Sequence, residues 1–448
     1  MSAAQQTASA GYTRSLSEYC VALNVDRLDP DVVRVTRQTL LDTLGVMFAA
    51  ASEDATCAVV AEREEEGGTP QAWVVGRGRL LPATSAALVN GTAGHALDYD
   101  DVSIEMHGHP STVLWPAILA AADALGSVRF GGLIEAYVAG YVAAADLGNV
   151  MGDQLYHQGF HPTAVIGAIG AAAAVAKLYG MNGTDTAHAL SLAATQAAGL
   201  KSMFGSTTKP VHAGLAAAAG LRAVRLIHHG LRAREDGLEC KFGFASAYGT
   251  SLPGQISLDE SVIVRNLFKY HASCYFTHAP LELIREFIAH HSPTPDDITA
   301  IEVQVHSFAV EACRIKHPTS ALEAKFSIPH CIALALLGYD TGAIDTFGER
   351  LNDEHAMRLR QLVTLDQATG SEPTQAFMRV TMRNGLTFES RFDSGVPLAD
   401  LDRQQAKIDA KFLALMTPVA GAENALTIHK SLMNLSADAP WSSQLLHV

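Results

Sequence analysis

The fold is decided by one apolar stretch, Pro162–Gly180, which reads PTAVIGAIGAAAAVAKLYG. Its longest uninterrupted run, Ala164–Ala176, is shorter than the ~20 residues that a membrane-spanning helix needs. We therefore interpret this run as a helix that is buried within the protein. Pro162 suits the first turn of a helix and Gly180 suits the position after the last turn, so the pattern predicts a helix over residues 162–179.

The composition around this helix is uniform, since Ala, Gly and Leu dominate from Ala83 to His229. Small residues on successive helices let their backbones approach closely, so we expect these helices to bury one another in a bundle. Helical spacing also precedes this region, over residues 14–62, where Asp29 is a suitable N-cap and Pro30 a suitable first helical residue. The helices predicted within the bundle are 83–97, 111–125, 131–150, 162–179, 184–198 and 213–229.

The character of the sequence changes near residue 260. Apolar and polar residues alternate over Ile298–Val305, which is typical of a half-buried strand. A hairpin is predicted over Phe377–Phe392, because Asn384-Gly385 separates two alternating runs. Helical spacing is found between them over Phe326–Leu337, and it returns over residues 400–416. The sequence therefore predicts an all-α part that is followed by an α+β part.

The overall charge limits the classes of partner. The chain of 448 residues carries 32 Lys and Arg against 46 Asp and Glu, a formal net charge of −14. This balance disfavours a nucleic-acid partner, which needs a basic face, but a local cationic pocket could still take a small anion. No basic segment followed by an apolar stretch opens the sequence, so we expect no signal peptide, no membrane partner and a cytoplasmic location.

Several common catalytic motifs are absent from the sequence. It contains no GxGxxG after a strand, no GxxxxGKS or GxxxxGKT, no HExxH and no GxSxG, which disfavours a standard nicotinamide, flavin or ATP enzyme. The six cysteines are far apart and form no CxxC pair, so neither a zinc ribbon nor a compact iron–sulfur motif is expected.

The densest polar cluster covers residues 95–109, with four carboxylates and three imidazoles in a chain that is otherwise poor in charge. On a helix, His95, Asp98 and Tyr99 would share one face. The cluster indicates an acid/base or metal site, or alternatively a capped helix end with solvated aspartates. Asp and His are suitable metal ligands, but no fixed spacing favours a particular metal, so no metal is predicted.

Two further clusters each precede an Ala-rich helix. In GFHPT, residues 159–163, His161 falls at the N-terminal end of a helix, where it would either help to hold an anion or simply pack. In residues 204–214, Lys209 is predicted to be extended because Pro210 follows it. The Lys209 ammonium would then help to form a pocket for a carboxylate at the N-terminus of the next helix. Alternatively, Lys209 would be an exposed lysine in a loop. The other candidate binding residues in this stretch are Thr207, Thr208 and His212.

Two clusters lie in the α+β part. Residues 269–278 contain Lys269 and Cys274, and residues 323–330 contain Ser327 and His330. Cys274 would be either reactive or a buried structural thiol, and His330 could be an ordinary core histidine.

Five motifs in order resemble the MmgE/PrpD family, which includes 2-methylcitrate dehydratase, cis-aconitate decarboxylase and iminodisuccinate epimerase. The motifs are NGTAGHALDYDD (Asn90–Asp101), GHPS (Gly108–Ser111), GFHPT (Gly159–Thr163), TTKPVHAG (Thr207–Gly214) and EAKFSIP (Glu323–Pro329). The resemblance implies a large all-helical bundle domain, a smaller α+β lid domain, a homodimer, an active site between the domains, and catalysis without a metal or organic cofactor. On this sequence the helical domain is expected over residues 1–262, with 400–448 returning to it, and the lid over 263–399.

The resemblance also implies the roles of individual residues. The expected catalytic set is Asp98, His109, His161, Lys209, Lys269 and Cys274, and the expected substrate-binding set is Thr207, Thr208, His212, Ser327 and His330. Two positions depart from the decarboxylase pattern, since Cys274 stands where the decarboxylase has His and His330 where it has Tyr. In addition, the stretch between Asp101 and His109 is one residue longer than in the decarboxylase, and in this it is more similar to the epimerase.

The expected function is therefore a lyase that acts on a small di- or tricarboxylate. Dehydration of a 2-methylcitrate-like hydroxy acid is the main prediction, because it is the best-known chemistry of the family that the sequence resembles. The alternatives are an epimerase of an iminodisuccinate-like dicarboxylate, a cis-aconitate-type decarboxylase and a non-catalytic carboxylate-binding relative. A metal-dependent hydrolase built on the His/Asp cluster is a further alternative.

Overall fold

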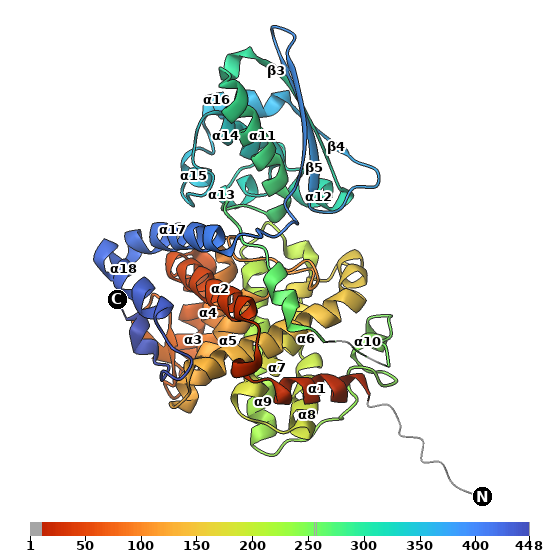
Figure 1. The fold of residues 1–448 in the computed structure, drawn as a ribbon, viewed down its shortest axis with the longest axis vertical. Helices are drawn as coiled ribbons and strands as arrows, with labels where there is room; N and C mark the ends of the chain where they lie inside the picture. Colours follow the sequence, from red (N-terminus) through yellow and green to blue (C-terminus); the bar gives the residue numbers. More distant parts are fainter. Residues whose placement is uncertain (1–10, 255, 257, 448) are drawn as a thin grey trace, which may run out of the picture.

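Helix α7 (Pro162–Leu178) forms the centre of the larger of two lobes in the computed structural model, which describes residues 11–254, 256 and 258–447 (Figure 1). All its residues from Pro162 to Ala176 are buried, as the apolar run predicts. It packs against α6 (Phe130–His157) and α9 (Thr208–His228). The apolar run is therefore a core helix that other helices surround.

The remaining helices of the larger lobe agree with the predicted ranges to within a few residues. Three boundaries differ more: α8 ends at Ala194 instead of residue 198, α9 begins at Thr208 instead of residue 213, and α6 ends at His157 instead of residue 150. The second difference arises because Pro210 is tolerated in a first helical turn, where its missing N–H is not needed. The other helices of this lobe are α1 (Tyr12–Ala22), α2 (Pro30–Ala49), α3 (Asp54–Glu66), α4 (Ala83–Ala96), α5 (Ser111–Leu125), α8 (Gly183–Ala194) and α10 (Phe244–Ala247).

Glycine allows helices α4 and α9 of the larger lobe to cross closely. A Cβ atom on Gly91 would lie 2.7 Å from the Cα of Gly214, and a Cβ atom on Gly214 would meet the backbone of Leu88. Any side chain at either position would therefore push the two helices apart. The contact is important for the site, because the residues that follow α4 and those that begin α9 both contribute to the cavity described below.

The smaller lobe is built on a four-stranded sheet of order β4-β3-β5-β6. Strand β3 (Ile298–Val305) lies inside the sheet and pairs in parallel with β4 (Val363–Gln367) and antiparallel with β5 (Gln375–Met382). Strands β5 and β6 (Thr387–Asp393) form the predicted hairpin, with Gly385 at φ 85° in its turn. The helices of this lobe are α11 (His278–His291), α12 (Ser307–Cys313), α13 (Ala321–Ala324), α14 (Ile328–Leu336), α15 (Thr346–Glu349) and α16 (Glu354–Leu359).

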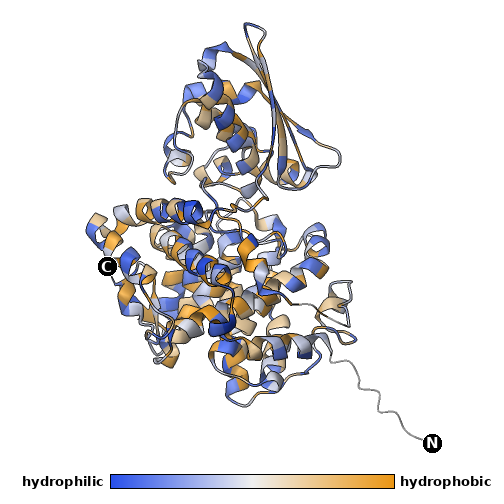
Figure 2. Cartoon of the chain, in the orientation of Figure 1, coloured by the Kyte–Doolittle hydropathy of each residue, from blue (hydrophilic) through white to orange (hydrophobic). Residues whose placement is uncertain are grey.

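The chain returns to the larger lobe through α17 (Leu401–Ala420), which packs against α2, and α18 (Ala422–Met433). Helix α17 alternates between hydrophobic and hydrophilic colour along its length in Figure 2, because one side is buried and the other is in solvent. The mainly helical fold with a smaller α+β part is as predicted. The domain boundaries at residues 262 and 399 stay a prediction.

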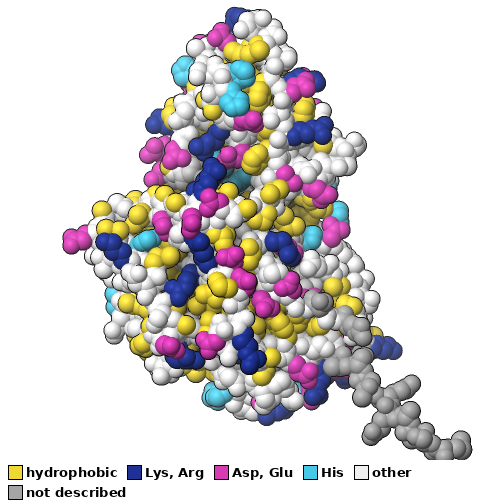
Figure 3. All heavy atoms as spheres, viewed as in Figure 1, with side chains coloured by type: hydrophobic (Ala, Val, Ile, Leu, Met, Phe, Trp, Pro, Cys, Tyr) yellow, Lys and Arg dark blue, Asp and Glu magenta, His cyan; other side chains and the backbone are white. Residues whose placement is uncertain are grey.

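A two-stranded antiparallel ribbon, β1 (Ala72–Val74) with β2 (Arg79–Leu81), packs on the helical lobe. Among the described residues, no single helix is long and apolar enough to cross a membrane, and only α2 with α3 passes such a test together, across an 82° bend. Acidic and basic side chains are interspersed on the face that Figure 3 shows.

Candidate active site

A cavity of about 290 Å³ lies between the two lobes. The helical lobe contributes residues from the loop after α4 and from the N-terminal ends of α7 and α9. The smaller lobe contributes Phe308 of α12 and Thr374, which precedes β5. All six residues of the predicted catalytic set line this cavity: Asp98, His109, His161, Lys209, Lys269 and Cys274.

Three buried lysines converge on the end of α4. The Lys209 ammonium donates a hydrogen bond of 2.6 Å to Oδ1 of Asp98. The Lys269 ammonium lies 3.4 Å from the same oxygen and donates to the Asp98 carbonyl at 2.7 Å. The third ammonium, that of Lys325, donates to the Leu97 carbonyl at 2.8 Å. This concentration of positive charge suits the binding of an anion.

Asp98 is held in an unusual backbone conformation. Its φ is 53°, in the left-handed region that residues other than Gly rarely adopt, although Asp tolerates it better than most. The expectation that His95, Asp98 and Tyr99 share a helix face is therefore wrong, because α4 ends at Ala96 and the chain turns there. The turn directs the Asp98 carboxylate toward Lys209.

The charge state of the Asp98 pair follows from its surroundings. Burial raises the pKa of Asp98, but the ammonium groups of Lys209 and Lys269 outweigh burial, so the pKa lies well below its ordinary value. Burial lowers the pKa of Lys209, and Asp98 outweighs that effect, so the pKa of Lys209 is raised. Both groups are therefore charged at neutral pH. Oδ2 of Asp98 has no hydrogen-bond partner among the described residues.

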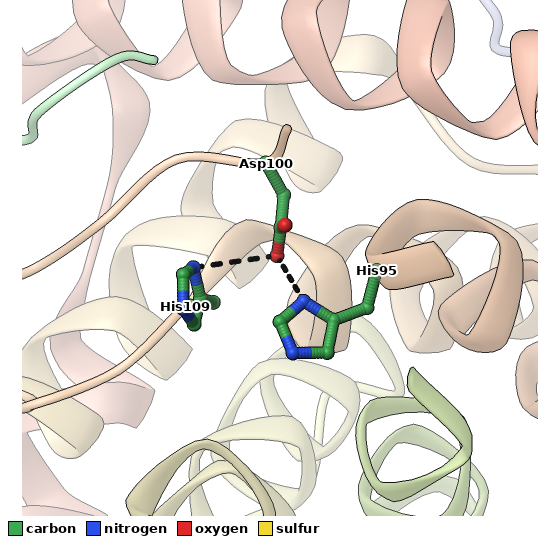
Figure 4. A group of neighbouring side chains, drawn as sticks. All are labelled: His95, Asp100 and His109. Atoms are coloured by element: carbon green, nitrogen blue, oxygen red, sulfur yellow. Dashed lines mark hydrogen bonds and ion pairs between the residues drawn. The ribbon is translucent and has the colours of Figure 1, made fainter. Parts of the chain in front are cut away.

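His109 shares a carboxylate with a second histidine, His95 (Figure 4). Oδ2 of Asp100 lies 2.7 Å from Nδ1 of His95 and 3.5 Å from Nδ1 of His109. Nδ1 of His109 also lies 2.8 Å from the carbonyl oxygen of Asp101, which can only accept a hydrogen bond. The proton of His109 is therefore on Nδ1, and its Nε2 keeps a lone pair.

The His109 imidazole is uncharged in the resting protein. Burial lowers the pKa of His109 to about 3, against the attraction of the Asp100 carboxylate. The imidazole is therefore neutral at pH 7. A neutral imidazole with its Nε2 lone pair free can accept a proton from a bound substrate, but this low pKa makes it a weak base unless a nearby negative charge stabilises the protonated form.

His161 lies at the N-cap of α7, as its position in the sequence predicts. Its Nδ1 is 3.2 Å from Nδ1 of His212, so one of the two rings donates to the other. Burial lowers the pKa of His161 well below its ordinary value. Two neutral imidazoles thus lie next to the start of α7, where the helix dipole favours an anion.

Cys274 faces the cavity and interacts with a second thiol, Cys313. A hydrogen bond from Cys313 lowers the pKa of Cys274, and the ammonium groups of Lys209 and Lys269 act in the same direction, against burial and Asp98. The same contact raises the pKa of Cys313, although burial is the larger cause. Cys274 is therefore the more acidic thiol and can exchange a proton with a group in the cavity.

None of the five predicted substrate-binding residues is among the described residues that line this cavity: Thr207, Thr208, His212, Ser327 and His330. Thr207 lines a neighbouring cavity, and Thr208 is exposed at the start of α9. Ser327 caps α14 by accepting from the backbone N–H of His330 at 3.2 Å. His330 is fully buried in the smaller lobe. Lys209 is also not extended as predicted, because it lies in the first turn of α9.

The neighbouring cavity has a volume of about 660 Å³ and shares Asp98 and Lys209 with the first. His95 and Lys325 line it on the other side of this ion pair. Burial lowers the pKa of Lys325 to about 8. The predicted catalytic and substrate-binding sets did not include Lys325, His95 or Asp100, although all three lie in the quoted motifs and His95 belongs to the cluster interpreted as an acid/base or metal site.

His95, Asp100 and His109 each offer a possible metal ligand, and these atoms lie within 4.8 Å of one another. The hydrogen bonds favour a different assignment. Nδ1 of His95 is at hydrogen-bond distance from an ionised carboxylate, and Nδ1 of His109 donates to the Asp101 carbonyl. Both nitrogens then carry protons and have no lone pair to offer a cation. We therefore describe the three residues as a hydrogen-bonded group.

Comparison with known proteins places the chain in a family. Residues 14–254 match the MmgE/PrpD N-terminal domain, and residues 271–435 match the MmgE/PrpD C-terminal domain. The protein therefore belongs to the MmgE/PrpD family, as the five sequence motifs indicate.

Curated relatives are similar over most of the chain. A human protein named cis-aconitate decarboxylase is 26% identical over 94% of this chain and 91% of its own length. The cis-aconitate decarboxylase of Aspergillus terreus is 25% identical over 82% of this chain and 80% of its own. A cis-aconitate decarboxylase-like protein of Aspergillus oryzae is 30% identical over 51% of this chain and 49% of its own.

Proposed function

We propose that this protein is a lyase that acts on a small di- or tricarboxylate by acid/base catalysis with its own side chains. The observation that carries the proposal is the position of two charged lysines, a neutral histidine and an acidified thiol around one cavity. The lysines and the start of α7 would hold substrate carboxylates, while His109 and Cys274 would move protons. This combination fits reactions at a carbon next to a carboxylate.

The lysines would do more than bind the substrate. When a proton leaves the carbon next to a carboxylate, negative charge grows on that carboxylate as an enolate-like species forms. Lys209 and Lys269 are fixed before the reaction by their bonds to Asp98, so they need little reorganisation to stabilise that charge. Such a preorganised cation can contribute several kcal/mol to the transition state.

We propose dehydration of a 2-methylcitrate-like hydroxy acid as the reaction. Dehydration needs a base for the C–H proton and an acid for the leaving hydroxyl group. His109 is neutral and has a free Nε2 lone pair, so it suits the base; Cys274 has a lowered pKa, so its thiol suits the acid. Each such group typically contributes 10²–10⁴-fold to the rate.

Decarboxylation of a cis-aconitate-like substrate is the second candidate. The curated relatives with the names given above support it, since they are similar over most of the chain. In that reaction carbon dioxide leaves, and a single acid then protonates the remaining carbanion. The presence of two proton-transfer groups in the cavity is the reason for preferring dehydration.

Proton NMR in deuterated water separates these reactions. The protein would be incubated with 2-methylcitrate, citrate, cis-aconitate and iminodisuccinate in turn, after treatment with a chelator. New alkene signals from a hydroxy acid are expected. Loss of carbon dioxide from cis-aconitate would establish the second candidate, and exchange or interconversion without a new skeleton would establish an epimerase. No change in any of the four compounds would contradict the proposed lyase.

A Cys274→Ser variant tests the thiol separately. Serine has nearly the same shape but a far higher pKa, so it is a poor acid in this position. We expect kcat/KM to fall by at least about 10²-fold with little loss of stability. Cys240→Ser, at a half-buried cysteine outside the cavity, serves as the control. Equal activity of the two variants would remove Cys274 from the mechanism.

A further inference from the structure

The hydrogen-bonded group of His95, Asp100 and His109 contains a buried carboxylate, that of Asp100, to which the proposed reaction gives no role. His109 lines the cavity, but His95 and Asp100 lie behind it and do not line it. Their side chains are fully buried. One Asp100 oxygen interacts with both histidines, while the other, Oδ1, has no partner among the described residues. Burying a carboxylate with so few hydrogen-bond donors lowers the stability of the fold. A role for its negative charge in the reaction would explain its presence.

We propose that Asp100 is the counter-ion of His109 when His109 takes a proton from the substrate, and that His95 is a positioning residue that satisfies Asp100 in the resting state, so that His109 stays neutral until then. The proposal rests on the proposed function, because it takes His109 as the base. In that step the C–H bond breaks, its electron pair stays on the substrate, and the proton binds Nε2 of His109. The imidazolium that results faces the Asp100 carboxylate.

The geometry supports this division of roles. The contact between His95 and Asp100 is short, at 2.7 Å, whereas the contact between His109 and Asp100 is 3.5 Å and too long for a good hydrogen bond. In the resting state, then, Asp100 is satisfied chiefly by His95. His109 is left neutral and reactive, and a protonated His109 would be drawn toward the carboxylate.

Most of the groups near His109 oppose its protonation. Burial lowers the pKa of His109 most, and Lys269, His95 and Lys209 act in the same direction. Asp100 is the strongest influence that favours the protonated form, and the Asp98 carboxylate also attracts it. Without a counter-ion, an imidazolium between two ammonium groups would be strongly destabilised. Asp100 therefore offsets part of the cost of protonating His109.

The test is an NMR titration of ¹⁵N- and ¹³C-labelled histidine, which needs no substrate. His109→Gln identifies the His109 signals. In the wild type, His109 is expected to stay neutral between pH 5 and 8, with its proton on Nδ1. In His95→Phe the Asp100 charge loses its nearest donor and acts on His109 alone, so the pKa of His109 should rise by about one unit or more. His188→Phe, at a buried histidine outside the cavity, should leave it unchanged.

The double variant His95→Phe/Asp100→Asn tests whether the Asp100 charge causes the rise in the pKa of His109. The rise in the pKa of His109 should disappear in it, because the charge that causes the rise is gone. A rise that persists, or no rise in a folded His95→Phe protein, would overturn the proposal. If the variants do not fold, the ¹⁵N shifts of the wild type still test the proposal, because a His109 ring that carries its proton on Nε2 would contradict the proposal. Displacement of the Nδ1 protons by stoichiometric Zn²⁺ would also overturn it, in favour of a metal site. Turnover is not measured, so this test can fail while the proposed function stands.

Discussion

Asp98 organises the electrostatics of the cavity, because two lysine ammonium groups contact it and a third contacts the carbonyl just before it. The three lysines are far apart in the sequence, on α9, before α11 and after α13. Burying them requires partners, and the turn at the end of α4 supplies a carboxylate and two carbonyls. The left-handed backbone of Asp98 is therefore part of the site.

The first prediction concerns Lys209. In a Lys209→Met variant, a bound carboxylate and the growing negative charge lose a fixed cation, so kcat/KM should fall by at least about 10²-fold on a substrate that the wild type converts. Lys241→Met, at an exposed lysine, is the control and should have little effect. Steady-state kinetics on folded proteins measure both. A Lys209→Met variant with near wild-type kcat/KM would remove this lysine from catalysis.

The second prediction concerns Asp101, whose pKa is raised to about 7 by burial. Below about pH 4 the group is protonated in both the folded and the unfolded state. Between pH 4 and 7 only the unfolded state loses the proton, so this group makes the protein less stable as pH rises through that window. Each unit of pKa shift is worth about 1.4 kcal/mol.

An Asp101→Asn variant lacks this titration and keeps a similar shape. Its free energy of unfolding, relative to the wild type, should therefore increase between pH 4 and 7 and level off above that. Urea unfolding at several pH values measures the difference, with Asp366→Asn, at an exposed carboxylate, as the control. A difference that is constant with pH would show that Asp101 has an ordinary pKa.

All six predicted catalytic residues line the cavity, whereas none of the five predicted substrate-binding residues does so among the described residues. Motifs brought Asp98, His109 and Lys209 to attention, and all three line the cavity. Ser327 and His330 belong to a motif as well, but Ser327 caps a helix and His330 fills the core of the smaller lobe. A motif marks residues that occur together; which of them reach a cavity depends on side-chain directions that only the folded chain determines.

At the scale of elements, α17 connects the end of the chain to the site. Lys411 on this helix donates a hydrogen bond of 2.7 Å to the Tyr99 carbonyl, next to Asp98, and lies 2.7 Å from Oδ1 of Asp42 on α2. Lys411 and Asp42 are both buried. Helix α17 therefore helps to fix the turn that carries Asp98 and Asp100.

The third prediction follows from this buried pair. Lys411→Met leaves the Asp42 charge without its partner and should lower the free energy of unfolding by about 3–5 kcal/mol. In the double variant Asp42→Asn/Lys411→Met no charge is left unpaired, so much of that loss should be recovered. Urea unfolding of the two variants and the wild type measures it. If the double variant is no more stable than Lys411→Met, the ion pair is not what the single variant disrupts.

Helices and strands could be predicted from the sequence where one pattern, such as an apolar run or a pair of turn residues, was clear. The Ala-rich helices are buried, so their apolar runs mark them clearly, and the Asn384-Gly385 turn marks the hairpin. Strand β4 was not predicted, because it is short and largely exposed, and its alternating run is only about four residues long. The start of α9 was placed too late because a proline was treated as a barrier, although it lies in the first turn.

At the scale of the whole molecule, the cavity depends on contacts between the lobes. The rings of Tyr156 on α6 and Phe308 on α12 lie 4.9 Å apart, and Lys201 forms an ion pair of 3.5 Å with Glu311 on α12. Both aromatic residues line the cavity. A change in the relative position of the lobes would therefore alter the shape of the cavity. The homodimer and the cytoplasmic location stay predictions from the sequence.

A crystal structure of the protein with tricarballylate tests the central claim most directly. This saturated tricarboxylate resembles the proposed substrates but has no hydroxyl group or double bond to react. The account predicts that it binds between the lobes, with carboxylates within hydrogen-bond distance of Lys209 and Lys269 and its carbon chain next to His109 and Cys274. Binding only in the neighbouring cavity beside Lys325, or no binding between the lobes at millimolar ligand, would contradict the account.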